Sequence, residues 1–236
     1  MRRSSRRTGA PWPLERRRPG LRDFVLAGLR EMYGLPAWER RREPTEELVV
    51  TILAQHTSDL NAERAFKELR RRLPSWSEVE AAPVEVVEAT IASGGLARQK
   101  APRIQASLRA IRAERGDYSL EFLGDRSPLA ARDWLTRIPG IGRKTASVVL
   151  LFSFGMPLMP VDTHVHRVTR RIGLIPPKTG ADEAHERLMA DIPADRIHEA
   201  HVNLITHGRR TCFARNPACF RCAVRARCRY VDPRAP

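Results

Sequence analysis

The sequence predicts an all-α fold of about ten helices. Apolar residues recur three or four positions apart along most of the chain, which is the spacing that places them on one face of a helix. Proline and glycine interrupt these stretches, as at Leu73-Pro74 and Gly94-Gly95. No stretch of sequence alternates apolar and polar residues as a half-buried strand does, and no solenoid repeat is evident. The 236 residues, 42% of them apolar, suffice for one or two domains with hydrophobic cores.

The first 20 residues are predicted to form a basic arm without regular structure. Seven arginines and three prolines fall in this segment, which has no apolar period. Such a composition is typical of disordered chain. The prolines oppose the amphipathic helix of a mitochondrial transit peptide, and the missing apolar core argues against a secretion signal. We expect the helical pattern to start at Leu21.

Several helices can be placed from their apolar stripes. One stripe comprises Ala62, Ala65, Phe66, Leu69 and Leu73, and another comprises Ile104, Leu108 and Ile111. An amphipathic helix is predicted at about 129–137. The segment 145–154 is apolar on nearly every face, which favours a helix buried inside the protein.

The net charge of +15 is extreme for a chain of this size. A strongly basic protein most readily meets a polyanion, and nucleic acid is the leading candidate, although a merely solvated basic surface gives the same count. The longest apolar stretch, 148–160, is too short to span a bilayer and is broken by Gly155 and Pro157. We therefore expect a soluble protein without a membrane partner.

Arginine accounts for 38 of the 42 basic residues, which we attribute mainly to codon bias in a GC-rich genome. The four lysines, Lys67, Lys100, Lys144 and Lys178, are therefore of particular interest. Arginine can supply positive charge almost anywhere, but it cannot lose a proton and become a nucleophile.

The segment 138–144 reads IPGIGRK and separates the predicted helix at 129–137 from the buried one. Two glycines in a tight turn let backbone N–H groups approach a ligand, and the positive end of the following helix dipole favours a phosphate. A helix–glycine hairpin–helix of this kind predicts a sequence-independent clamp on the DNA backbone, whereas the plainer interpretation is a simple turn. The expected contact residues are Pro139, Gly140, Ile141, Gly142 and Arg143.

Lys144 stands at the start of the buried helix, beside Arg143. A lysine next to another cation and near a buried core loses its proton more readily and becomes a nucleophile that can attack a sugar carbon and form a Schiff base. A phosphate-binding lysine is the alternative. Asp162 follows an apolar loop and precedes another predicted helix, where an aspartate serves well as an N-cap. It can also act as a carboxylate opposite Lys144, stabilising a cationic transition state and assisting proton transfer.

All four cysteines fall within 17 residues. They are Cys212, Cys219, Cys222 and Cys228, separated by six, two and five residues. Four thiols this close together are typical of a four-iron, four-sulfur cluster, one tetrahedral zinc ion or two disulfides. Zinc sites usually pair two Cys-x2-Cys knuckles, and only one is present, so the unequal spacing favours the cluster while zinc stays open. Disulfides are the least favoured, because nothing indicates an oxidising compartment.

Together these motifs resemble endonuclease III, the iron–sulfur branch of the helix-hairpin-helix DNA glycosylases. The hairpin with its lysine, the Val-Asp-Thr-His segment at 161–164, the triplet His207-Gly208-Arg209 and the cysteine spacing carry the resemblance. It covers about 21–230.

The resemblance implies two helical domains flanking a DNA-binding cleft. A six-helix barrel would span 35–154 and contain the helix-hairpin-helix at 129–154. The second domain would join 21–34 to 155–236 and hold one [4Fe-4S] cluster on the four cysteines.

The resemblance further implies a bifunctional DNA glycosylase/AP lyase of base excision repair, with Lys144 and Asp162 as its catalytic residues. The enzyme would flip a damaged base, an oxidised pyrimidine by expectation, out of the duplex. Lys144 would displace the base at C1′ through a Schiff base, and β-elimination would nick the strand. We expect a monomer that acts on double-stranded DNA containing damaged bases or abasic sites, in a bacterial cytoplasm and associated with the nucleoid.

Three more DNA contacts follow from the resemblance. Gln55 matches the glutamine that fills the space left by the flipped base, Leu96 matches an opposing wedge, and His164 lies in the matching segment. Two departures, His56 and His166, fall in or near the expected base pocket and affect the expected lesion preference.

Two other functions are left open by the sequence. The first is a monofunctional mismatch or uracil glycosylase of the same superfamily, of which the adenine-specific members usually lack a lysine where Lys144 stands. The second is a non-enzymatic DNA-binding module with structural zinc.

Overall fold

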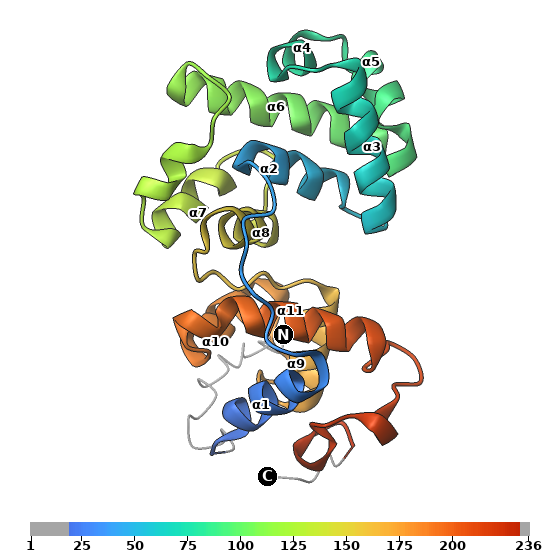
Figure 1. Ribbon diagram of the computed structural model, residues 1–236, viewed down its shortest axis with the longest axis vertical. Coiled ribbons are helices and arrows are strands. Elements are labelled where there is room, and N and C mark those ends of the chain that lie inside the picture. The colour runs from blue at the N-terminus through green and yellow to red at the C-terminus, as the bar shows by residue number, and fades with distance from the viewer. Residues whose placement is uncertain (1–18, 232–236) are drawn as a thin grey trace, which may run out of the picture. The chain divides into compact units, whose positions relative to one another are not determined.

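The computed structural model describes residues 19–231, and within this range the chain consists of helices and connecting loops without a strand (Figure 1). The predicted all-α fold is confirmed, with eleven α-helices in the described range against about ten expected. Residues 1–18 and 232–236 lie outside the described residues, and the predicted basic arm at 1–20 falls almost entirely among them. No helix within 19–231 combines the length and the apolar composition needed to cross a membrane.

The chain divides into two compact units. The central unit comprises Pro36–Pro160 and Ala194–His198, and the terminal unit comprises Met1–Leu35, Val161–Pro193 and Glu199–Pro236. The sequence predicts a barrel domain at 35–154 and a cluster domain formed by 21–34 and 155–236. These two domains and their roles stay predictions.

Seven α-helices and three short 3₁₀ helices build the central unit, and Figure 1 labels the α-helices. They are α2 (Pro44–Leu53), α3 (Asp59–Arg72), α4 (Trp76–Ala81), α5 (Val84–Thr90), η2 (Ala92–Gly94), α6 (Ala97–Arg115), η3 (Glu121–Asp125), α7 (Pro128–Thr136), α8 (Arg143–Phe154) and η4 (Ala194–Arg196). Helix α2 packs against α3, α6 and α8, and α7 packs against α8. Leu48, Ile52 and Leu53 of α2 are fully buried, so this helix lies at the centre of the unit's core.

The predicted stripes form the buried faces of α3 and α6, with one exception at the end of the first stripe. Helix α3 ends at Arg72, and Leu73 is its C-cap with φ −128° and ψ 82°. Pro74 explains this end, because the residue before a proline is displaced from the helical region by the proline ring. Leu73 therefore belongs to the turn and is only partly buried.

The segment around the glycine hairpin follows the sequence closely. The helix expected at 129–137 is α7, which begins at Pro128 after an N-cap Ser127 whose side chain accepts from Ala130 N. The buried helix expected at 145–154 is α8, most of whose residues from Thr145 to its end are buried. Gly155, with φ 68°, ends it in the left-handed conformation that glycine adopts without strain.

The terminal unit contains α1 (Leu21–Tyr33), α9 (Thr163–Ile172), α10 (Ala181–Asp191), most of α11 (Ile197–Arg210), and the 3₁₀ turns η5 (Cys219–Arg221) and η6 (Arg225–Arg227). Arg30 of α1 binds Glu199 of α11 through two hydrogen bonds of 2.7 Å. Asn203 of α11 donates to the carbonyl oxygen of Gly34 at 3.1 Å. A Cβ on Gly28 would stand 3.1 Å from Val224, so a glycine lets α1 pack closely against the cysteine-bearing loop.

Candidate functional site

A tight turn joins α7 to α8. The amide of Ile141 donates to the carbonyl oxygen of Ile138 at 3.0 Å. Gly140 has φ 86°, which suits the third position of a type II turn after Pro139 and strains any residue with a side chain. Both isoleucines are buried, whereas Pro139 and Gly140 are exposed. The isoleucines anchor the turn and the backbone between them is presented outward, so Ile141 shapes the turn and its predicted DNA contact stays a prediction.

Helix α8 begins directly after this turn, and Lys144 is its second residue. Gly142 is the N-cap; it is exposed, and a Cβ there would meet no atom within 4 Å. The first four N–H groups of a helix have no partner within the helix, and the helix dipole adds partial positive charge at this end. Arg143 is exposed and Lys144 is half-buried. Two cations therefore stand at the N-terminus of a helix, an arrangement suited to a phosphate group.

Gln55 is linked to the hairpin by contacts on both sides of its amide. Its Nε2 donates to Oγ1 of Thr145, the residue after the predicted nucleophile, at 3.4 Å. Its Oε1 accepts from Nη1 of Arg103 at 3.0 Å. The Arg103 side chain also packs over the turn, since a Cβ on Gly140 would stand 2.8 Å from Arg103 Cδ. Arg103 therefore connects Gln55 with the turn, a link that the sequence did not reveal.

Leu96 lies on a second loop of the central unit, immediately before α6. Its side chain is 46% exposed, which is high for a leucine and leaves it available to an apolar partner. Leu96 has φ 51°, and His56, next to Gln55, has φ 54°. A left-handed backbone at a non-glycine residue is uncommon and strained, and such residues gather at functional sites. Each of the two loops predicted to enter DNA thus contains one non-glycine residue with a left-handed backbone.

Asp162 is the N-cap of α9 in the terminal unit. Its Oδ1 accepts from the backbone N–H of Val165 at 2.7 Å, so the cap suggested by the sequence is present. The side chain is half-buried. Asp162 belongs to the terminal unit and Lys144 to the central unit, and their joint catalytic role stays a prediction.

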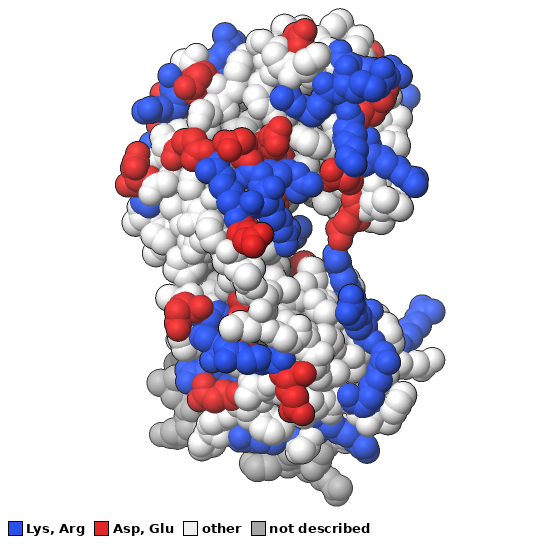
Figure 2. Space-filling model, viewed as in Figure 1, with Lys and Arg blue, Asp and Glu red and all other residues white. Residues whose placement is uncertain are grey.

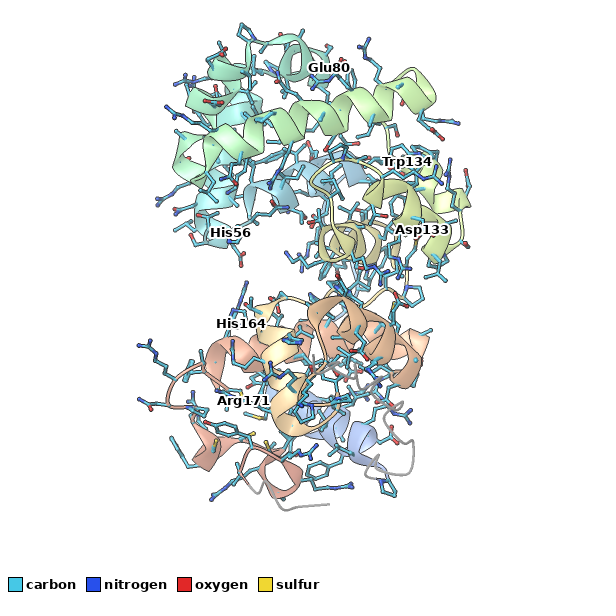
Figure 3. All side chains as sticks on the ribbon, turned by 180° about the vertical axis from the view of Figure 1, so that it is seen from behind. His56, Glu80, Asp133, Trp134, His164 and Arg171 are labelled. Atoms are coloured by element: carbon cyan, nitrogen blue, oxygen red, sulfur yellow. The ribbon has the colours of Figure 1, made fainter. Side chains whose placement is uncertain are left out.

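His164 stands one turn before Arg167 on α9, and Arg167 joins it to the cysteine loop (Figure 3 labels His164). Arg167 Nη2 donates to Nδ1 of His164 at 3.1 Å and to the carbonyl oxygen of Gly208 at 2.9 Å. Its Nε donates to the carbonyl oxygen of Cys212 at 3.1 Å. A Cβ on Gly208 would stand 2.7 Å from the Cβ of His164, so only glycine lets α9 and α11 approach here.

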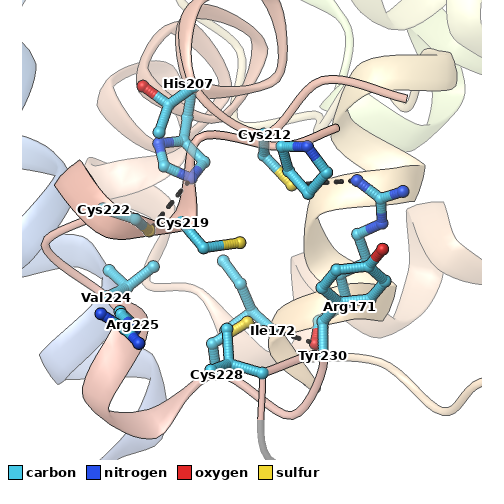
Figure 4. Close-up of a pocket in the computed structure, with 13 residues that line it drawn as sticks. Arg171, Ile172, His207, Cys212, Cys219, Cys222, Val224, Arg225, Cys228 and Tyr230 are labelled. Carbon is cyan, nitrogen blue, oxygen red and sulfur yellow. Dashed lines mark hydrogen bonds between the residues drawn. The ribbon is translucent and has the colours of Figure 1, made fainter. Parts of the chain in front are cut away.

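The four cysteines line one cavity in the terminal unit (Figure 4). Its empty volume is about 330 Å³, part of it open to solvent. All four residues are free cysteines, so none of them is held in a disulfide. Four cysteines from one short segment of the sequence therefore line the same cavity, as expected for a shared inorganic group.

Arg171 connects α9 to the same cavity (Figures 3 and 4). Its guanidinium donates to the carbonyl oxygens of Phe213 at 2.6 Å and Ala214 at 2.9 Å. It lies 3.5 Å from the sulfur of Cys212 and 4.4 Å from the ring centre of Tyr230. This arginine fixes the start of the loop between the first two cysteines and places positive charge beside a sulfur.

His207 closes another side of the cavity and is 1% exposed. Its Nε2 lies 3.6 Å from the sulfur of Cys222, and its Nδ1 lies 3.0 Å from the hydroxyl of Tyr33. Burial lowers the pKa of His207 to about 4. The imidazole is therefore neutral at neutral pH, and it packs rather than carrying charge.

Burial also raises the pKa of the thiols of Cys222 and Cys228. Buried thiols become thiolates readily only when a metal or another cation offsets the desolvation. Four cysteine sulfurs are a donor set that suits an iron–sulfur cluster as well as a zinc ion.

An open groove of the terminal unit is lined mainly by arginines. These include Arg167, Arg170 and Arg229. His166 also borders it and donates from Nε2 to the carbonyl oxygen of Thr179 at 2.8 Å. On the face drawn in Figure 2, a band of Lys and Arg side chains follows the right-hand edge of this unit. The positive charge of the groove is suited to a polyanion.

Comparison with protein families decides the relationship. The model of the "HhH-GPD superfamily base excision DNA repair protein" matches residues 49–194, a span that includes the hairpin, Lys144 and Asp162. The chain belongs to the HhH-GPD superfamily.

Curated members of this superfamily match most of the chain. Endonuclease III of Bacillus subtilis is 36% identical over 213 residues, which cover 90% of this chain and 93% of that protein. Endonuclease III of Thermotoga maritima is 33% identical over 199 residues, which cover 84% and 89%.

A solved structure also matches most of the chain in three dimensions. It is described as a trapped endonuclease III–DNA covalent intermediate and has a TM-score of 0.76 and 31% identity. The match covers 91% of this chain and 97% of that one. The resemblance to endonuclease III seen in the motifs is therefore confirmed along nearly the whole chain.

Proposed function

We propose that the protein is a bifunctional DNA glycosylase/AP lyase of base excision repair. The observation that carries this proposal is the position of Lys144, the second residue of α8, just after an exposed glycine turn. The likeness to a protein trapped as a covalent intermediate with DNA supports it, because such an intermediate requires a nucleophile on the protein.

The chemistry follows from one amine. With the damaged base flipped out, Lys144 Nζ forms a bond to C1′ of the deoxyribose while the glycosidic bond breaks and the base departs with its electron pair and a proton. Opening of the sugar ring leaves a protonated Schiff base. Loss of a proton from C2′ then expels the 3′ phosphate, which nicks the strand. Asp162 stabilises the cationic sugar and assists these proton transfers.

The remaining site residues hold the DNA. The amides of the hairpin turn and the start of α8 bind the phosphate backbone, assisted by Arg143. Gln55 and Leu96 enter the duplex where the base has left, and His164 contacts the DNA from α9. The substrate is double-stranded DNA that contains oxidised pyrimidines or abasic sites. The protein acts as a monomer in a bacterial cytoplasm, associated with the nucleoid that holds its substrate.

A [4Fe-4S] cluster bound by Cys212, Cys219, Cys222 and Cys228 completes the proposal. The shared cavity, the raised pKa of the Cys222 and Cys228 thiols, and Arg171 of α9 support it. When bound, the cluster holds the four cysteines of the loop in fixed positions. It takes no part in a redox step during base removal. Arg171 and His207 orient the ligands from outside.

Replacing Cys222 by Ser should release the cluster. We expect the purified variant to lose its bound iron and visible absorbance, and to unfold about 10 °C or more below the parent protein, because the cluster contributes to folding. Metal analysis and thermal unfolding measure both effects. Ala218→Ser, which adds a hydroxyl to the same loop and keeps all four thiols, should retain both properties. A colourless parent protein that contains zinc would contradict the cluster.

The catalytic proposal is tested with duplexes that each carry one defined lesion. We expect the protein to release an oxidised pyrimidine, to nick the strand, and to form a covalent adduct with DNA when borohydride is present, since borohydride reduces a Schiff base. Base release without nicking or an adduct would instead favour a monofunctional glycosylase. Binding without base release would favour a non-enzymatic module.

A further inference from the structure

Among residues 19–231, Lys100 is the most deeply buried charged residue outside the proposed catalytic machinery. It lies on α6 and is 1% exposed, in a chain whose basic residues are almost all arginines. Its Nζ donates to the carbonyl oxygen of Leu53 at 2.7 Å and to that of Gly94 at 2.8 Å. Burial lowers the pKa of Lys100, so the ammonium is kept in the core at an energetic cost.

The two carbonyls occupy matching places in the chain. Leu53 is the last residue of α2 and stands two residues before Gln55. Gly94 is the last residue of η2 and stands two residues before Leu96. The last carbonyls of a helix have no partner within it and carry partial negative charge, so each suits a cation. One ammonium thus joins the bases of both loops proposed to enter the DNA.

Both loops depend on such support. His56 in the first and Leu96 in the second hold left-handed backbone at non-glycine positions. Strained residues of this kind persist only where the surrounding structure over-determines them. The Lys100 ammonium restrains both loops from a single side chain, through the carbonyl oxygens of Leu53 and Gly94.

We propose that Lys100 is a positioning residue which ties the loops of Gln55 and Leu96 together, so that both are presented to damaged DNA in one fixed arrangement. A restraint made before binding reduces the ordering that the complex must otherwise impose, and so increases affinity for the distorted duplex. A lysine suits the task because its compact head has three donors, whereas a planar guanidinium is larger and directs its donors in one plane. This role rests on the proposed function. It concerns the recognition of damaged DNA and not the breaking of bonds.

The test compares Lys100→Met, which keeps an unbranched side chain one atom shorter than lysine and removes its donors, with the parent protein. Affinity is measured for a duplex with an uncleavable abasic-site analogue and for the same duplex undamaged. We expect the ratio of the two affinities to fall about tenfold, KM on the damaged duplex to rise about tenfold, and kcat at saturation to stay within about twofold.

Two control variants separate positioning from folding. Leu108→Ala removes a buried side chain from the same helix and should lower the unfolding temperature without changing the affinity ratio. Lys178→Met removes an exposed lysine and should change neither. If Lys100→Met merely reproduces Leu108→Ala, the ammonium supports the core alone and the proposal is wrong.

A double-mutant cycle tests whether Lys100 acts through the two loops. In a Gln55→Ala, Leu96→Ala background, Lys100→Met should cause no further loss of the affinity ratio. An additive loss would overturn the proposal. If Lys100→Met does not fold, Lys100→Gln takes its place. The glutamine amide keeps a donor on a side chain shorter than that of lysine, so this variant should lose only part of the affinity ratio. A parent protein that neither distinguishes the duplexes nor forms a borohydride adduct would count against the proposed function instead.

Discussion

Replacing Lys144 by Gln should abolish the borohydride-trapped adduct and lower base release and strand nicking by about a thousandfold or more. The amide of glutamine has no nucleophilic electron pair, so the bond to C1′ cannot form. The side chain is half-buried at the second position of α8, and the change in folding stability should stay within about 1 kcal/mol. Gel separation of protein–DNA adducts and single-turnover kinetics measure the effect.

Two further variants show whether charge or nucleophilicity matters at this place. Lys144→Arg keeps the positive charge but not the nucleophile, so it should bind the uncleavable duplex and fail to form the adduct. Arg143→Gln removes the neighbouring exposed charge and should weaken binding while the adduct still forms. An adduct that persists in Lys144→Gln would identify another amine as the nucleophile. Among the lysines, Lys67 and Lys178 would then be the candidates, because Lys100 is enclosed in the core.

The parts of the site that the sequence predicted are those fixed by neighbouring residues. A proline and a glycine at the centre of a turn, followed by a glycine N-cap, determine the hairpin between α7 and α8 locally. The cap by Asp162 and the shared cavity of the four cysteines are also short-range features. Little tertiary information is needed for any of them.

The contacts that the sequence did not predict are made between distant segments. Lys100, Arg103, Arg167 and Arg171 each bind a backbone or side-chain atom between 41 and 48 residues away. Three of them are arginines in a chain where arginine is the ordinary basic residue, so no composition signal marks them. The close approach of α9 to Gly208 depends likewise on how two helices cross, which one glycine in a sequence does not indicate.

Replacing Asp162 by Asn should lower kcat by about a hundredfold or more while α9 stays intact. The carboxylate accepts from Val165 N–H at 2.7 Å, and the carbonyl oxygen of asparagine caps a helix about as well as aspartate. The substitution therefore removes the negative charge and keeps the cap, which separates two roles held by one residue. Binding of the uncleavable duplex should be unchanged or slightly tighter, because a negative charge is lost near a polyanion.

Asp162→Ala supplies the comparison for the cap. It removes both the charge and the hydrogen bond to Val165, so we expect the same loss of kcat together with a loss of about 1 kcal/mol in the free energy of unfolding. A difference between the two variants in stability alone would mean that the charge acts in catalysis and the cap in folding. If Asp162→Asn turned over at nearly the parent rate, the carboxylate would serve α9 only, and another group would have to stabilise the cationic sugar opposite Lys144.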